Sequence, residues 1–263
     1  MLNALELDCQ REAQRIVDYI RQQLHQSGHS RMVLGLSGGI DSALVAYLGV
    51  QAVGAENVKA MVLPYATSNP QSEADANLVA AALGIPCERF DITGMVAPLL
   101  ERYPDMSAGR LGNAMARARM IVLFDQSVLF RGLVVGTSNR TETLLGYFTM
   151  HGDGAAAFKP LAHLYKCQVR ALSRWVGVPE PLVTKAPSAD LWQGQTDEGE
   201  LCFCYDEADQ VLYLLTEERR TIDEIAAQGF DRRIVECIER RMLSTDFKRH
   251  APAILPTVAE ARG

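Results

Sequence analysis

The stretch Leu34-Gly35-Leu36-Ser37-Gly38-Gly39-Ile40-Asp41-Ser42 decides the fold of this 263-residue chain. The apolar run 31–36 predicts a buried strand, and the residues of 41–53 predict the helix that follows it. Glycines in such a turn let the backbone approach phosphate oxygens, and the start of a helix points its positive dipole end at the same place. Asp41 alone would repel phosphate, so its presence predicts a bridging Mg²⁺. The stretch therefore indicates a phosphate-binding loop rather than a plain turn that caps a helix.

The elements around this loop alternate between strands and helices. Strands are predicted at 31–36, 58–64, 87–92 and 133–136, and helices at 4–24, 41–53, 71–83 and 113–130. Such alternation predicts an α/β fold, a doubly wound parallel sheet with helices on both faces. Ligands of these sheets bind at the carboxyl ends of the strands, which is where the loop lies. The loop has neither a Gly-Lys-Ser/Thr ending nor a Gly-x-Gly-x-x-Gly pattern.

The pattern changes after residue 136. Helices are predicted at 163–176, 205–215 and 222–243, and a long loop at 179–199, which give a helical C-terminal portion. We expect one domain over 1–263. Its parts would be an N-terminal helix over about 1–30, a nucleotide-binding core over about 31–136, and substrate loops with C-terminal helices over about 137–263.

Composition narrows the class of protein. The net charge of −6 disfavours non-specific nucleic-acid binding, and the six cysteines lack the density of a disulfide scaffold. Cys202 and Cys204 form a Cys-x-Cys, which is weak evidence for zinc. No apolar run is long enough to span a membrane, and the N-terminus does not read as a secretory signal. We expect a soluble, cytoplasmic protein.

A second group of motifs follows in close order. It comprises Gly136-Thr137-Ser138-Asn139-Arg140-Thr141-Glu142, Gly146-Tyr147-Phe148-Thr149, Gly152-Asp153-Gly154, Pro160-Leu161, Leu164-Tyr165-Lys166 and the run from Lys185 to Glu198. The phosphate loop alone resembles that of the ATP-pyrophosphatase (N-type PP-loop) family, whose members cleave ATP between the α and β phosphates. With the second group, the chain resembles the ammonia-dependent NAD synthetases from about residue 37 to about residue 248.

This resemblance implies a ligase that forms a C–N bond. Such an enzyme adenylates the nicotinate carboxylate of deamido-NAD with ATP, and ammonia then gives NAD, AMP and pyrophosphate. It further implies a homodimer with the helix 113–130 near the interface, and a loop at 187–198 that orders over the reacting carboxylate and excludes water.

The resemblance also implies roles for individual residues. ATP would be bound by Gly35, Leu36, Ser37, Gly38, Gly39, Ile40, Asp41, Ser42, Thr137, Lys166 and Ser188. Mg²⁺ would be held by Asp41 and Glu142, catalytic roles would fall to Asp41, Lys166 and Asp153, and the acid would lie against Arg117, Lys248, Met150 and Ala157. A Lys or Mg²⁺ at such a site stabilises charge that builds on phosphoryl oxygens.

Plainer interpretations of the same residues stay open. Glu142 and Lys166 suit a solvated surface, Arg117 and Arg119 suit an exposed helix face, and Ser188 suits the cap of a turn.

Three positions depart from the family pattern. Met150 stands where a lysine is common, Ala157 where an aspartate is common, and Phe247 where a histidine is common. All three belong to the dinucleotide side of the family's site, whereas the ATP side matches. A lysine and an aspartate lost together leave no unpaired partner, so the change is compensated. The same amidation of a smaller acid, such as nicotinate mononucleotide, is therefore an alternative.

Two other classes fit less well. A tRNA-modifying relative is disfavoured by the acidic charge and by the absence of paired Cys-x-x-Cys motifs, and a non-enzymatic regulator by the retention of Asp41 and Glu142. Only about 30 residues precede the phosphate loop, too few for the amidase domain of glutamine-dependent relatives. Free ammonia is the expected nucleophile, unless a separate glutaminase subunit delivers it.

Overall fold

The computed structural model describes residues 2–188, 197–201 and 203–255. Within this part of the chain, four parallel strands form one sheet in the order β3-β2-β1-β4. The strands are β1 (Met32–Gly35), β2 (Val58–Val62), β3 (Cys87–Arg89) and β4 (Leu133–Val134). All four predicted strands are confirmed, although each is shorter than the apolar run that predicted it.

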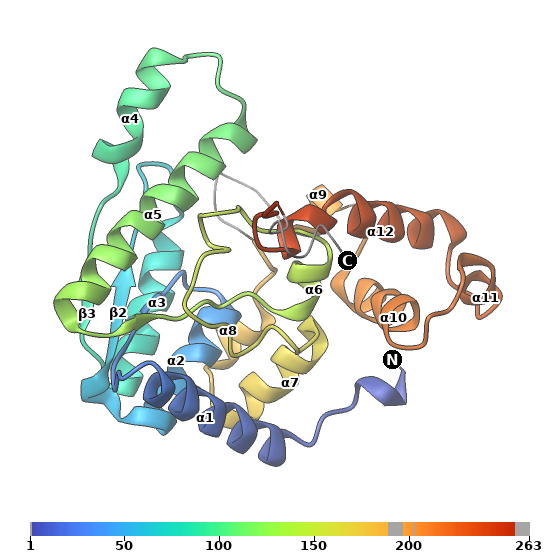
Figure 1. Cartoon of the computed structure of the whole chain (residues 1–263), viewed down its shortest axis with the longest axis horizontal. Helices are drawn as coiled ribbons and strands as arrows, with labels where there is room; N and C mark the ends of the chain where they lie inside the picture. The colour runs from blue at the N-terminus through green and yellow to red at the C-terminus, as the bar shows by residue number, and fades with distance from the viewer. Residues whose placement is uncertain (1, 189–196, 202, 256–263) are drawn as a thin grey trace.

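Helices cover both faces of the sheet (Figure 1). Because successive side chains of a strand point to opposite faces, Met32 and Leu34 pack on one side and Val33 on the other. The first side holds α1 (Cys9–Gln26), α2 (Ile40–Val53), α3 (Pro70–Leu83) and α7 (Lys166–Val176), and the second holds α4 (Thr93–Arg102) and α5 (Ala108–Phe130). The predicted doubly wound arrangement is therefore confirmed.

The strand order places a switch point between β1 and β4. The chain runs outward from β1 to β2 and β3, then returns to pair β4 with the free edge of β1. Loops that follow strands on either side of such a point diverge and leave a crevice for ligands. The loop after β1 is the phosphate loop, and the segment after β4 begins the second group of motifs.

A second core carries the C-terminal part of the chain. It gathers Leu145, Tyr205, Leu212 and Ile238, from α6 (Arg140–Leu144) and its end, α10 (Tyr205–Thr216) and α12 (Arg232–Ser244). In Figure 1 these helices lie on the side of the molecule away from α4. The remaining elements are η1 (Asn3–Leu5), η2 (Ala55–Asn57), α8 (Glu180–Thr184), α9 (Asp197–Leu201), α11 (Ile222–Ala226) and η3 (Asp246–Arg249).

Several predicted helices have other bounds in the structure. The helix predicted at 222–243 is two helices, because Gly229 has a left-handed φ of 98° and Asp231 caps a new helix by accepting the N–H of Arg233. The segment predicted as one helix at 4–24 is η1 followed by α1, which Asp8 caps. The helix predicted at 163–176 begins at Lys166.

Other short helices were not predicted. α8 and α9 lie within the stretch predicted as a loop at 179–199, and α6 lies in the Gly-rich stretch after 136. α4 contains Pro98, and α5 begins five residues earlier than predicted, at a cap formed by Ser107. Gly and Pro lower helix propensity, so packing rather than local preference fixes these segments.

The described part of the chain has no helix with both the length and the apolar character needed to cross a bilayer. Cys202 lies outside the described residues, and Cys204 is exposed.

Candidate active site

The phosphate loop is folded by its own side chains and by α3. Ser42 Oγ accepts the N–H of Ser37 at 3.2 Å and donates to the carbonyl of Gly39 at 3.0 Å. Gly38 has a φ of 74°, and a Cβ atom there would collide with the backbone carbonyl of Ser72. α2 starts at Ile40, and no side chain caps it. An uncapped helix start behind a glycine turn suits an anion such as a phosphate.

Three charged side chains meet beside this loop, one from each of three helices. Lys166 Nζ lies 2.6 Å from Asp41 Oδ2 and 3.2 Å from Glu142 Oε1. Lys166 is 3% exposed, and both carboxylates are largely buried. The plainer interpretations of Lys166 and Glu142 as surface charges are therefore wrong. We refer to Asp41, Glu142 and Lys166 as the charge cluster.

Asn139 orients both carboxylates, although no role was predicted for it from the sequence. Its Nδ2 donates to Asp41 Oδ1 at 2.9 Å, and its backbone N–H donates to Glu142 Oε2 at 3.3 Å. Its Oδ1 also accepts the backbone N–H of Glu142 at 2.9 Å. Asn139 is completely buried, and it forms a capping box with Glu142 at the start of α6. The Asn-x-x-Glu spacing of a capping box was the signal that could have found it. Because Asn139 engages Oδ1 of Asp41, the other oxygen is left facing Lys166.

The electrostatics of the charge cluster favour a bound cation. Burial and the neighbouring Asp41 carboxylate raise the pKa of Glu142 to about 7, against the attraction of Lys166. Burial alone would lower the pKa of Lys166, but the Asp41 and Glu142 carboxylates raise it above its ordinary value. Lys166 is therefore fully charged at neutral pH. One ammonium does not neutralise two ionised carboxylates, so a bound cation would supply the positive charge that the cluster lacks.

The residues fit Mg²⁺ if phosphates share it. Carboxylate oxygens are the protein ligands that Mg²⁺ prefers, and one or two of them usually suffice beside substrate phosphates. Among the described residues, no group of three or more His, Cys, Asp or Glu side chains is arranged to hold a metal ion. Asp41 and Glu142 match the shared arrangement rather than an all-protein cage.

Two further contacts enclose the same region. Lys185 Nζ lies 2.7 Å from Asp75 Oδ2 and 3.3 Å from the carbonyl of Gly38, so it ties the phosphate loop to α3. Tyr205 lies with its ring under the Lys166 ammonium, 5.2 Å from Nζ to the ring centroid, and its hydroxyl donates to Asp197. The contacts of Lys185 were not predicted, because they join residues 110 and 147 positions apart.

The remaining predicted ATP residues are less buried than the charge cluster. Thr137 is half-buried, two residues after the isolated bridge at Val135 that continues β4, and Ser188 is exposed. The loop predicted to order at 187–198 lies partly outside the described residues, which exclude 189–196. At its ends, the N–H of Asp197 donates to the carbonyl of Pro187 at 3.0 Å.

Arg117 and Lys248, predicted to contact the acid, and Asp153, predicted to be catalytic, bond to the backbone of the loop 146–154. Arg117 Nε donates to the carbonyl of Met150. Lys248 Nζ donates to the carbonyls of Gly146 and Phe148 at 2.8 and 2.9 Å. Asp153 Oδ1 accepts the N–H of Thr149 at 2.9 Å. These bonds shape the loop, and direct contacts to an acid stay a prediction.

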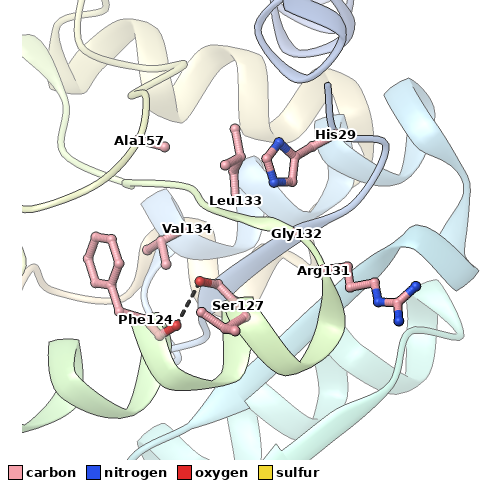
Figure 2. Close-up of a pocket in the computed structure, with 9 residues that line it drawn as sticks. His29, Phe124, Ser127, Arg131, Gly132, Leu133, Val134 and Ala157 are labelled. Atoms are coloured by element: carbon pink, nitrogen blue, oxygen red, sulfur yellow. Dashed lines mark hydrogen bonds between the residues drawn. The ribbon is translucent and has the colours of Figure 1, made fainter. Parts of the chain in front are cut away.

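Ala157 lines a mostly apolar pocket of about 420 Å³ between α5 and β4 (Figure 2). Phe124 and Val128 of α5, together with Leu133 and Val134, form much of its wall. Phe247, the third departure from the family pattern, is exposed on η3. The pocket therefore places one of the three unusual positions in a hollow of the surface.

A phosphate loop at the switch point of a parallel sheet, beside two buried carboxylates and a lysine, defines a nucleotide-binding α/β enzyme of the ATP-pyrophosphatase class. The family model described as NAD synthase matches residues 12–252. The chain belongs to the NAD synthase family.

Individual relatives agree with this assignment. An NH(3)-dependent NAD(+) synthetase of Trichlorobacter lovleyi is 48% identical over 96% of this chain and 93% of its own. The solved NH3-dependent NAD synthetase of Campylobacter jejuni is 33% identical, with a TM-score of 0.82 over 95% of this chain and 100% of its own. The NMN synthetase of Francisella tularensis is 32% identical, with a TM-score of 0.84 over 95% and 99%.

Proposed function

We propose that this protein is an ammonia-dependent NAD synthetase, a ligase that amidates deamido-NAD at the expense of ATP. The observation that carries the proposal is the charge cluster. In a chain with 48% identity to an NH(3)-dependent NAD(+) synthetase, it lies directly beside a phosphate loop. Carboxylates are poor acyl donors, and transfer of AMP to the acid supplies the leaving group that an amide synthesis needs.

The reaction has two steps. A carboxylate oxygen of the acid attacks the α phosphorus, and the bond from that phosphorus to the pyrophosphate breaks. Ammonia then attacks the acyl carbon, AMP leaves with the electrons of the acyl C–O bond, and the nitrogen loses a proton. The first step places growing negative charge on phosphoryl oxygens, so positive groups aimed at these oxygens accelerate it.

We assign the roles in this chain from position and charge. The N–H groups of the loop from Gly38 to Ser42 would bind phosphate oxygens at the start of α2. The Lys166 ammonium would stabilise charge on the transferred phosphoryl group. Asp41 and Glu142 would hold Mg²⁺, which supplies neutralising charge to the phosphates when bound. Thr137 and Ser188 would contact ATP at the rim.

The acid would bind on the side of the loop 146–154, within reach of Arg117 and Lys248. The pocket at Ala157 is not assigned to the acid, because His29, Arg131 and Gly132 in its lining precede β1 and β4 and so lie at the amino ends of these strands. A lid over 187–198 would keep water from the acyl-adenylate, which hydrolyses readily. Asp153, which shapes the loop, stays a catalytic candidate only.

A smaller acid is the second candidate substrate. It is favoured by the likeness to a solved protein described as an NMN synthetase and by Met150, Ala157 and Phe247. Nicotinate mononucleotide carries the same reacting carboxylate as deamido-NAD but lacks the second nucleotide. The relatives at up to 48% identity favour deamido-NAD as the main substrate.

The experiment incubates the purified protein with ATP, Mg²⁺, ammonium and either acid, and follows NAD, nicotinamide mononucleotide and AMP by chromatography. NAD with stoichiometric AMP supports the proposal. AMP release with nicotinate mononucleotide, without NAD from deamido-NAD, would assign the chain to the second candidate. Asp41→Ala should abolish AMP formation with either acid, and full activity would refute its assigned role.

We further propose a homodimer that works in the cytoplasm with free ammonia. The outward face of α5 supports the dimer, since Ile121, Phe124, Val128 and Leu129 repeat at helical spacing and are all exposed. A second copy of the same face would bury it in a two-fold contact. A separate glutaminase is a possible ammonia source that nothing in the described residues requires.

A further inference from the structure

Asp209 is a buried carboxylate to which the proposed mechanism gives no role. It lies on α10, in the second core, and is completely inaccessible to solvent. Its Oδ1 accepts the hydroxyl of Thr141 at 2.5 Å, and its Oδ2 accepts the N–H of Cys167 at 2.7 Å. Burial of a charge is costly unless hydrogen bonds compensate it, so these contacts account for its presence in the core.

These bonds form a closed ring with the start of α7. Thr141 Oγ1 also accepts the N–H of Lys166 at 3.0 Å, and Lys166 is bonded to Cys167 through the chain. The N–H groups of Lys166 and Cys167 belong to the first turn of α7, where no helical carbonyl is available to accept them. Asp209 and Thr141 accept both.

The ring joins two members of the charge cluster. Lys166 carries the ammonium, and Thr141 is followed directly by Glu142, so one carboxylate on α10 fixes the starts of both α6 and α7. The ring uses both oxygens of Asp209 as hydrogen-bond acceptors. An amide at this position would turn a donor toward either the Thr141 hydroxyl or the Cys167 N–H.

We propose that Asp209 is a positioning residue for the ATP-activating step, which acts by holding Lys166 and Glu142 at their spacing. This inference rests on the proposed function, because that function assigns Lys166 and Glu142 to ATP. Small displacements of groups that align reacting atoms cost large factors in rate, whereas the acid is bound by other elements.

The test compares Asp209→Asn with Asp206→Asn. Asp206 also joins α10 to α7, because its Oδ1 accepts a hydrogen bond from Arg170 Nη1 at 2.6 Å. This contact is exposed, and Asp206 lies about one turn before Asp209 on α10. Asp209→Asn should lower kcat at least about tenfold and raise the KM for ATP, with the KM for deamido-NAD within about twofold. Asp206→Asn should leave all three near their original values. Loss of helix packing alone would not separate the two substrates, so equal effects on both KM values, or equal behaviour of the two variants, would overturn the inference.

A second pair of variants covers the case in which Asp209→Asn does not fold, as judged by circular dichroism and melting temperature. Thr141→Val removes the hydroxyl that closes the ring with little change of shape, and Thr141→Ser keeps it. We expect Thr141→Val to reproduce the ATP-selective loss and Thr141→Ser to restore at least about half of the activity. Equal activity of these two variants would overturn the inference.

The proposed function and this inference fail in different ways. A wild-type chain that forms neither NAD nor AMP defeats the proposed function. In that event the ring is tested by calorimetric titration with ATP and Mg²⁺. Weaker ATP binding in Asp209→Asn and Thr141→Val, but not in Asp206→Asn and Thr141→Ser, supports the ring, and equal binding overturns it.

Discussion

Asn139 bonds to both acidic members of the charge cluster. Its side-chain amide donates to Asp41 Oδ1 and its backbone N–H donates to Glu142 Oε2, so the other oxygen of each carboxylate faces Lys166. Its position could be read from the sequence only as the cap of a helix. The sequence did predict Asp41, Glu142 and Lys166 as members of one site. It did not predict Asn139, Lys185 or Asp209, because their partners lie far away in the chain and their contacts depend on tertiary packing.

At this scale we predict the effect of Asn139→Asp. The variant would replace an N–H donor by a second carboxylate oxygen 2.9 Å from Asp41, and like charges at that distance repel strongly when buried. Mg²⁺–ATP affinity and activity should fall by about tenfold or more. Asn113→Asp is the matched control, because Asn113 already accepts a hydrogen bond through its oxygen, from Thr149. Titration calorimetry measures both variants, and equal losses would contradict the prediction.

A second residue-scale prediction concerns protons. The pKa of Glu142, raised to about 7 in the free chain, leaves its carboxyl partly protonated at neutral pH. A carboxyl loses its proton when it binds a cation, so Mg²⁺–ATP binding should release about half a proton at pH 7 and almost none at pH 8.5. The sign follows from a raised pKa, since the proton to be displaced is present only below about pH 8.

Calorimetry in two buffers of different ionisation enthalpy measures this release. Glu142→Gln supplies the control, because its side chain has no proton to lose and its release at pH 7 reports the nucleotide alone. An unchanged release in Glu142→Gln would show that Glu142 is not the source.

At the scale of elements, the C-terminal helices hold the loop that precedes the proposed acid site. Arg241 donates to the carbonyl of Leu145, Arg249 to that of Leu144, and Lys248 to those of Gly146 and Phe148. Alternation of strands and helices was readable from periodicity, but these bonds join positions about a hundred residues apart. The bounds of α4 and α5 were not predicted, because Gly and Pro weaken the local helix signal there and packing overrides that signal. The split of the predicted helix 222–243 at Gly229 was not predicted either.

Gly146 offers a test of this loop. Its φ of 60° disfavours a side chain, and a Cβ atom there would collide with Thr245 at the end of α12. Gly146→Ala should destabilise the protein by more than the roughly 1–2 kcal/mol of a left-handed backbone alone. Gly28→Ala gives that backbone cost by itself, since Gly28 has a φ of 71° with open space around it. Urea unfolding of both variants measures the difference, and equal destabilisation would contradict a steric role for Thr245.

At the scale of the whole molecule, the sequence supported the parallel sheet and its helical covering. Short apolar runs separated by helices allow few other arrangements. The strand order could not be predicted, because the sequence of β4 does not indicate whether it pairs with β1 or with β3. The division of the chain at about 30 and about 136 stays a prediction. Residues 137–263 contribute Val169 and Leu172 of α7 to the first core and form most of the second core.

The proposed homodimer is also tested at the scale of the whole molecule. Val128 is 79% exposed on α5 and lies in the apolar row proposed as the contact between copies. Val128→Glu would place a charge against its own copy across a two-fold axis, so we expect a monomer by sedimentation at micromolar concentration. Trp175→Glu, at an exposed apolar residue of α7, should leave the assembly unchanged. A monomeric wild type, or a dimer that persists in Val128→Glu, would rule out this face.

The charge cluster has a consequence for how the enzyme selects its nucleotide. When Glu142 is ionised, two carboxylates and one ammonium give the charge cluster a single net negative charge, held in a largely buried space. A bare polyphosphate is repelled by this charge, whereas a polyphosphate that carries its own divalent cation is less negative and presents that cation to the carboxylates. If Asp41 and Glu142 hold Mg²⁺ as proposed, the site would favour the metal complex over the free nucleotide. The occupancy of the enzyme would follow the magnesium-complexed fraction of cellular ATP rather than its total.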